Sequence, residues 1–139
     1  MYDIIFLYAK LRIQAKRDSA MREMVKASKA LSDETRLRML NVLMERECCV
    51  CEVMQALQIS QARASRNLSA LYDAGFLKLR RNGLWSLYSI DEKGLKDYHI
   101  DLLDAVGKAL KGNETALLDR QRLKSAERVG PGCVRRASK

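Results

Sequence analysis

The sequence is poor in histidine and lacks any long apolar run. His99 is the only histidine among 139 residues, which argues against a zinc site built on imidazole groups. The most apolar stretch near the start, residues 4–8, is too short to span a bilayer, and no small-residue cleavage site follows it. We therefore expect neither a membrane span nor an export signal, and we expect a cytoplasmic protein.

Cysteine is scarce as well, but it is concentrated. Three of the four cysteines, Cys48, Cys49 and Cys51, lie within four residues. That spacing does not suit a disulfide framework. In a chain without an export signal, neighbouring cysteines indicate reduced thiols in a cytosol.

Acidic residues are too few to balance the basic ones, and the formal net charge is +9. Residues 60–90 hold five basic residues and one acid, and residues 114–139 hold seven basic residues and three acids. Such an excess favours a polyanionic partner, either nucleic acid or an anionic membrane surface. The first excess lies inside the part of the chain that is expected to fold, which favours nucleic acid.

The spacing of apolar residues predicts helices for most of the chain and two strands near its middle. We expect residues 1–20 to form an N-terminal helix for dimer contacts, 21–111 to form the folded domain, and 112–139 to be a basic flexible tail. Within the domain, the expected elements are a helix from Asp33 to about Glu45, a short helix 50–57, a helix 61–74 with an inward stripe of Ala64, Leu68 and Leu71, strands 76–81 and 84–90 joined at Asn82-Gly83, and a last helix capped by Asp91.

A helix pair with a tight turn, followed by a hairpin with a basic tip, is typical of a winged helix-turn-helix. We therefore predict a mainly α fold with a small β-hairpin wing. The second helix of such a pair enters the major groove, and the wing meets phosphate or the minor groove. The predicted DNA-contacting residues are Ser60, Gln61, Arg63, Ser65, Arg66 and Asn67 on the helix, with Arg80 and Arg81 on the wing.

Five ordered segments resemble the ArsR/SmtB family of repressors, and the resemblance covers roughly residues 24–100. These segments are Ala30–Leu40, Cys49–Val53, Ser60–Leu68, Gly75–Leu77 and Arg81–Trp85. The resemblance implies a homodimer formed by the first and last helices, which binds a palindromic promoter site and leaves it when an inducer binds. It implies a regulator without catalytic activity and without a permanent cofactor.

The cysteine cluster resembles the element that senses trivalent arsenic in the arsenic-responsive members of that family. Soft thiolates select soft ions, and a helix start favours the thiolate. We hypothesise that Cys49 and Cys51 form the core pair. The third cysteine of those members is replaced here by Met54, so Cys48 or Cys133 would have to complete a three-thiol site. Two thiols alone would favour methylarsenite over arsenite, and antimonite is a further candidate.

Asp97 and His99 resemble half of the zinc site of other family members. The residues where the other half should follow, Leu110 and Asn113, are poor zinc ligands. We interpret His99 as a dimer-interface or surface residue.

Three other functions compete with arsenical sensing. A repressor of the same fold could sense oxidants or reactive sulfur, with Cys49 or Cys48 forming a disulfide, for instance with Cys133. A thiol enzyme would need a base, or a Cys-x-x-Cys unit on a suitable fold; we find no such base, and Cys48 and Cys51 have that spacing without the fold. A DNA-packing protein would bind without sequence preference and would leave the cysteines unused.

Overall fold

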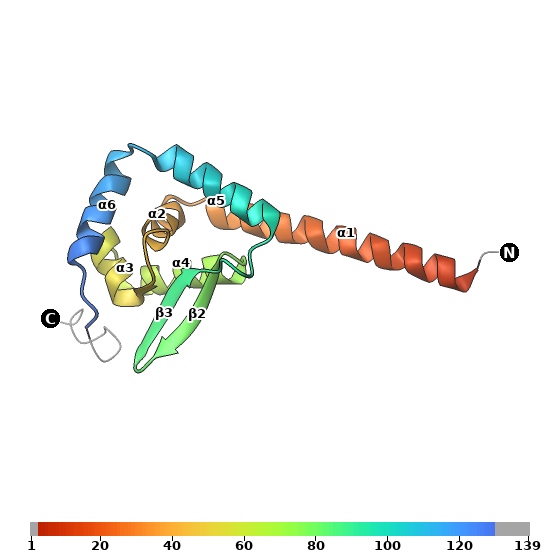
Figure 1. The fold of residues 1–139 in the computed structure, drawn as a ribbon, viewed down its shortest axis with the longest axis horizontal. Helices are drawn as coiled ribbons and strands as arrows, with labels where there is room; N and C mark the ends of the chain where they lie inside the picture. The colour runs from red at the N-terminus through yellow and green to blue at the C-terminus, as the bar shows by residue number, and fades with distance from the viewer. Residues whose placement is uncertain (1–2, 130–139) are drawn as a thin grey trace.

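The computed structural model describes residues 3–129 and contains six helices and three strands in that range. In chain order the elements are α1 (Ile4–Leu31), α2 (Glu34–Leu43), β1 (Cys48–Cys49), α3 (Val50–Leu57), α4 (Gln61–Asp73), β2 (Leu77–Asn82), β3 (Trp85–Ile90), α5 (Asp97–Leu110) and α6 (Glu114–Ser125). The predicted mainly α fold with a hairpin wing is confirmed (Figure 1).

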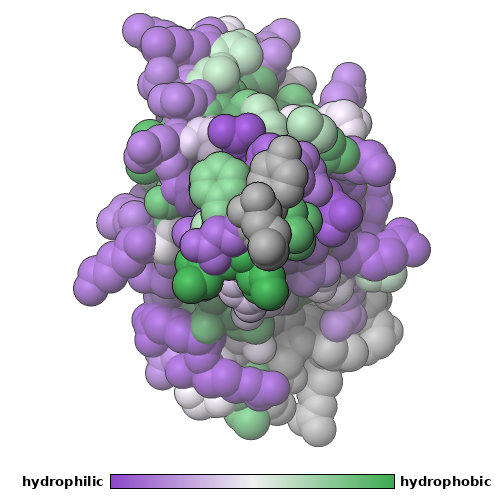
Figure 2. Space-filling view, turned by 90° about the vertical axis from the view of Figure 1, so that its right-hand side faces the viewer, coloured by the Kyte–Doolittle hydropathy of each residue, from purple (hydrophilic) through white to green (hydrophobic). Residues whose placement is uncertain are grey.

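Helix α1 runs without a break through the boundary expected at residue 20. Its N-terminal half extends away from the remainder of the fold (Figure 1), and only Ala27 and Ala30 are buried. Asp3 caps its start by accepting a hydrogen bond from the Ile5 N–H. Apolar side chains gather around its projecting end (Figure 2), and the exposed ones there are Ile4, Ile5, Phe6, Leu7, Tyr8, Leu11 and Ile13.

Helix α4 agrees closely with the prediction for the second helix of the pair. Ser60 accepts a hydrogen bond from the Arg63 N–H, which caps the helix start. The predicted inward stripe of Ala64, Leu68 and Leu71 is buried. Gly75 ends the helix with a φ of +91°, a backbone conformation that disfavours any residue with a Cβ atom.

The sheet has three antiparallel strands in the order β1-β3-β2, and the sequence analysis missed β1. Cys48 pairs with Tyr88, and Cys49 pairs with Leu87. The hairpin turn lies one residue later than predicted, because Asn82 still pairs with Trp85 and the two turn residues are Gly83 and Leu84. Gly83 has a φ of +61°, which a two-residue hairpin turn requires.

The prediction that Asp91 caps the last helix is wrong. Asp91 instead anchors a turn, since its carbonyl accepts the N–H groups of Gly94 and Leu95, and α5 begins at Asp97. The interpretation of His99 as an interface or surface residue is wrong as well. His99 is buried, its Nε2 lies 3.0 Å from the Ala74 carbonyl oxygen, and its Nδ1 accepts the Lys96 N–H. These two hydrogen bonds place its proton on Nε2.

Residues 114–125, which were expected in a flexible tail, form helix α6 packed against α2 and α3. Its anchor is Asp119, which is fully buried and accepts hydrogen bonds from Arg38 at 2.8 Å and Arg122 at 2.7 Å. Arg38 and Arg122 also donate to the carbonyl oxygens of Leu57 and Ala56 at the end of α3. The apolar pattern could not reveal this helix, because a carboxylate lies at the centre of its buried face.

Replacing Asp119 by alanine should lower the free energy of unfolding by about 3 kcal/mol, because two partly buried guanidinium groups lose their counter-ion. Urea titration followed by circular dichroism measures this change. The matched control is Asp104→Ala, which removes an exposed ion pair with Lys108 on α5 and should cost less than about 0.5 kcal/mol. Equal losses in both variants would show that α6 is not held by the buried pair.

Candidate DNA interface and thiol site

The exposed face of α4 carries the side chains that were predicted to read DNA. Arg63 and Arg66 are exposed, while Gln61 and Ser65 are partly exposed near the helix start. Arg63 donates to the Thr35 hydroxyl at 2.9 Å, so α2 already orients this side chain. Arg66 lies on the exposed face of α4, and the opposite face of the helix packs into the core.

Two of the predicted contacts, Ser60 and Asn67, also have roles within the fold. The Ser60 hydroxyl caps α4, and the Asn67 side-chain oxygen accepts a hydrogen bond from Arg36 at 3.0 Å. Because Arg36 also donates to the carbonyl oxygens of Ala30 and Lys29, Asn67 ties α4 to the end of α1.

The wing presents Arg80 and Arg81 on its exposed strand β2. Arg80 forms a bidentate pair with Glu47, with N–O distances of 2.7 Å and 2.6 Å. The hydrogen bonds from Arg80 hold the pKa of Glu47 below the usual range. Glu47 directly precedes the cysteine cluster, so this ion pair joins the wing to the segment that carries the thiol groups.

The structure separates Cys48 from the other two cysteines, because successive residues of a strand point to opposite faces. Cys48 packs into the main hydrophobic core, whereas Cys49 and Cys51 pack in a second cluster with Leu87, Trp85 and Val129. Burial raises the pKa of the Cys48 thiol to about 12, and this thiol faces the Arg46 carbonyl oxygen at 3.4 Å.

The sulfur atoms of Cys49 and Cys51 lie 2.6 Å apart. A regular helix would point residues two apart in nearly opposite directions, but Cys49 has the extended conformation of an N-cap, and Cys51 lies in the first turn of α3. The strand-to-helix junction thus brings the predicted core pair together. Within residues 3–129, no three His, Cys, Asp or Glu side chains form a cluster able to hold a metal ion.

Glu52 is bonded to the backbone of Cys49 and to two arginine side chains beside the sulfur pair. Burial raises the pKa of the Cys49 thiol, while the N–H groups of Glu52 and Cys51 act in the opposite direction. The Glu52 carboxylate accepts the Cys49 N–H and forms ion pairs with Arg46 and Arg128. Burial alone would raise the pKa of Glu52, but these hydrogen bonds outweigh it, and the pKa lies below the usual value.

Residues Glu127–Val129, which we call the strap, run beside the two sulfur atoms. Gln55 on α3 binds both the N–H and the carbonyl oxygen of Glu127, at 3.1 Å and 2.8 Å. Arg128 reaches Glu52, and the Trp85 indole N–H donates to the Val129 carbonyl oxygen at 3.2 Å. No short motif marks the strap or Trp85 as parts of the site, so sequence reasoning missed both. Cys133 lies outside the described residues.

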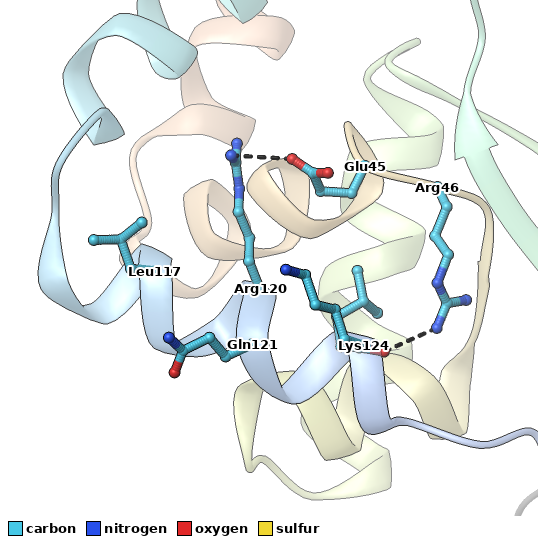
Figure 3. A pocket seen from close by; sticks show the side chains of 7 residues that line it. Glu45, Arg46, Leu117, Arg120, Gln121 and Lys124 are labelled. Atoms are coloured by element: carbon cyan, nitrogen blue, oxygen red, sulfur yellow. Dashed lines mark hydrogen bonds and ion pairs between the residues drawn. The ribbon is translucent and has the colours of Figure 1, made fainter.

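A hollow between α2 and α6 lies near this site but has a different character (Figure 3). It is lined by Glu45, Arg46, Leu117, Arg120, Gln121, Leu123 and Lys124. Arg120 already pairs with Glu45 at 3.0 Å, and Arg46 donates to the Leu123 carbonyl oxygen (Figure 3). No sulfur atom lines the hollow, so it is not the thiol site. Among the described residues, no helix is both long and apolar enough to cross a membrane.

Comparison with known proteins agrees with this arrangement. Residues 33–78 match the model of the bacterial regulatory proteins of the arsR family. A cadmium resistance transcriptional regulatory protein, a CadC homolog from Staphylococcus aureus, is 35% identical over 100 residues, which cover 69% of this chain and 83% of that protein. The arsenic resistance transcriptional regulator ArsR1 of Pseudomonas putida is 48% identical over 63 residues, which cover 45% of this chain and 49% of that protein.

A solved structure supports the fold. The homodimeric winged helix-turn-helix domain of a possible ArsR-family regulator from Mycobacterium bovis aligns with a TM-score of 0.59 at 24% identity, covering 70% of this chain and 87% of that one. The fold, the matched segment and the similarity to the staphylococcal regulator lead to one conclusion. This chain belongs to the ArsR family of bacterial regulatory proteins and is a transcriptional repressor rather than an enzyme.

Proposed function

We propose that this repressor binds promoter DNA as a homodimer in the cytoplasm and is released when trivalent arsenic binds Cys49 and Cys51. The observation that carries the proposal is the convergence of these two sulfur atoms at the start of α3. Helix α3 directly precedes the DNA-facing helix α4, and β1 pairs with the wing strand β3. A ligand at the two thiols therefore acts on both DNA-contacting elements.

The geometry of the pair favours a small pyramidal atom. Two sulfur atoms bound to one soft atom at about 2.3 Å stand roughly 3.8 Å apart when the angle at that atom is near tetrahedral. A linear two-coordinate ion would need a separation of roughly 4.6 Å by the same bond length. Both separations exceed the 2.6 Å between the Cys49 and Cys51 sulfur atoms, and the separation for a pyramidal atom is the nearer of the two.

The named relatives differ in the ion that their names record, cadmium in one and arsenic in the other. The soft sulfur atoms of Cys49 and Cys51 favour a soft, thiol-seeking ion. Arsenite, methylarsenite and antimonite are the candidate inducers. For arsenite or antimonite, Cys133 is the better candidate for a third donor, because it follows the strap closely in sequence and Cys48 faces the core.

The proposed DNA contacts are those of two α4 helices in successive major grooves, with the wings outside them. Gln61, Ser65 and Arg66 would reach bases, while Arg63, Arg80 and Arg81 would contact bases or phosphates. Ser60 and Asn67 would mainly hold the helix in place. Glu47 and the phosphate would have to share Arg80, which makes the Arg80 contact sensitive to movement of the cysteine segment.

The proposed dimer uses α1 and α5. Both helices expose apolar side chains that a single chain leaves in water, Met24 and Val25 on α1 and Ile100 on α5. A second copy would bury these faces. The N-terminal half of α1, including residues 4–20, would then lie along the partner.

A thiol-redox repressor of the same fold is the second candidate, and the short distance between the Cys49 and Cys51 sulfur atoms favours it. Oxidation would also change the start of α3 and could release DNA. Dithiothreitol distinguishes the two functions, because it would restore DNA binding after oxidation.

The central test follows the fluorescence anisotropy of a labelled duplex, selected from random sequence by the reduced protein, during titration with arsenite and methylarsenite at fixed salt. We expect methylarsenite to release the duplex, and we expect Cys49→Ser and Cys51→Ser to abolish the release. Cys48→Ala is the matched control and should respond as the wild type does. Loss of the arsenite response alone in Cys133→Ser would identify Cys133 as the third donor. DNA release by neither compound would contradict the arsenical function.

Replacing Arg66 by alanine should weaken binding to the selected duplex about 10- to 100-fold, because a base contact is lost. Binding to an unrelated duplex should change much less. The control Lys124→Ala removes an exposed positive charge on α6, and its affinity should stay within about twofold of wild type. An equal loss on both duplexes for Arg66→Ala would show that Arg66 contacts phosphate only.

Cys48 should be the slowest of the three clustered thiols to react with iodoacetamide. Its thiolate is scarce at pH 8 because burial raises its pKa to about 12. Mass spectrometry of the reduced, folded protein should show labelling of Cys48 at least about tenfold slower than labelling of Cys49. The urea-unfolded protein is the control, since all thiols should then react alike. Equal rates in the folded protein would contradict the assignment of Cys48 to the core.

A further inference from the structure

The tip of the wing is attached to a distant segment of the chain. The hairpin of β2 and β3 extends away from the helices (Figure 1), and Trp85 pairs with Asn82 beside its turn. The Trp85 indole N–H donates to the Val129 carbonyl oxygen at 3.2 Å. Both side chains pack against the buried cluster that contains Leu87, two residues further along β3. The strap therefore reaches the wing close to its turn.

The strap is also bound to α3. Gln55 on α3 donates to the Glu127 carbonyl oxygen at 2.8 Å and accepts the Glu127 N–H at 3.1 Å. Arg128 donates to the Glu52 carboxylate at 2.8 Å. Helix α6, which ends just before the strap, packs against α2 and α3. The strap thus links the tip of the wing to a helix that is itself held in the core.

The wing depends on such a link because little of it is buried. All residues of β2 after Leu77 are exposed, and Leu84 in the turn is 65% exposed. A two-stranded hairpin without further packing is marginally stable in water and opens locally at low cost. The base of the wing is held by the pairing of β3 with β1 and by the ion pair of Arg80 with Glu47. The strap adds a second attachment near the tip.

We propose that the strap positions the wing for DNA binding, with Trp85 and Gln55 as the positioning residues. This inference rests on the proposed function, because it assumes that Arg80 and Arg81 contact DNA. Arg81 pairs with Ser86, the residue after Trp85, so the attachment of Trp85 fixes the strand pair that carries Arg81. Trp85 and Gln55 act through the wing arginines and need no contact with DNA of their own.

The gain in DNA affinity comes from ordering the wing before it meets DNA. A mobile segment that becomes ordered on binding loses backbone and side-chain freedom, and this loss lowers the affinity. A wing held by the strap has already lost that freedom. Helix α4 is held separately, because its buried face packs in the main core. Release of the strap should therefore weaken the wing contacts and leave the α4 contacts in place.

The experiment compares two labelled duplexes by fluorescence anisotropy with the full chain at fixed salt. One is the selected duplex, and the other is shortened at both ends, so that it keeps the α4 sites and lacks the outer base pairs that the wings would cover. We expect Gln55→Ala and Trp85→Ala to weaken binding to the selected duplex about three- to tenfold, since one hydrogen bond changes an equilibrium constant about fivefold. Binding of both variants to the shortened duplex should stay within about twofold of wild type.

Hydrogen–deuterium exchange of the DNA-free full chain measures the wing directly. In Gln55→Ala and Trp85→Ala, the hairpin amides within residues 79–86 should exchange at least about tenfold faster than in the wild type, because the hairpin opens more often. The matched controls are Gln121→Ala, which changes an exposed glutamine on α6, and Leu84→Ala, which changes an exposed apolar residue of the turn. Both controls should keep the wild-type exchange rates.

Gln55→Ala keeps the test decisive if Trp85→Ala does not fold, because Gln55 is only partly buried. Unchanged exchange of the hairpin in Gln55→Ala, or an equal loss of affinity on the two duplexes, would overturn the inference alone. Wild-type affinity of Arg81→Ala for the selected duplex would overturn the wing contact of the proposed function, and the inference with it. Faster hairpin exchange in Gln55→Ala would distinguish this second case from the first.

Discussion

The pairing of β1 with β3 is the constraint on which the arrangement of the site depends. Two residues of strand are enough to turn Cys48 into the main core and Cys49 toward the start of α3, where Cys51 meets it. The same pairing joins the cysteine segment to the strand that carries Trp85. A chain with three neighbouring cysteines thus presents a pair rather than a triad, and the pair is in direct contact with the wing.

Two buried carboxylates, those of Glu52 and Asp119, hold the elements around this junction through ion pairs. Glu52 forms ion pairs with Arg46 and Arg128, and its carboxylate also accepts the Cys49 N–H. Asp119 holds α6 through Arg38 and Arg122, and α6 in turn places the strap beside the sulfur atoms. Ligand and DNA affect each other's affinity by the same factor. If a ligand that moves the start of α3 or the strap lowers the affinity for DNA, DNA lowers the affinity for that ligand equally. The coupling between the two sites would pass through the ion pairs of Glu52 and Asp119 and through the pairing of Glu47 with Arg80.

Much of the fold could be predicted from the sequence, because capping residues and apolar spacing are local signals. Ser60, the stripe of Ala64, Leu68 and Leu71, and Gly75 defined α4 correctly. The misses have long-range causes. Strand β1 depends on a partner some forty residues away, α6 depends on a buried ion pair, and the buried His99 bonds to the distant carbonyl oxygen of Ala74. The prediction that Cys49 and Cys51 act together agrees with their proximity, but the packing of Trp85 and Val129 against them was not predicted, because it arises only from tertiary structure.

X-ray absorption at the arsenic edge tests the central claim most directly, because it counts the sulfur atoms bound to arsenic. The full chain would be loaded with methylarsenite, reduced and free of DNA. The account predicts two sulfur neighbours in the wild type and in Cys48→Ala and Cys133→Ser, and one or none in Cys49→Ser. Two sulfur neighbours in Cys49→Ser, or the loss of one in Cys133→Ser, would contradict it.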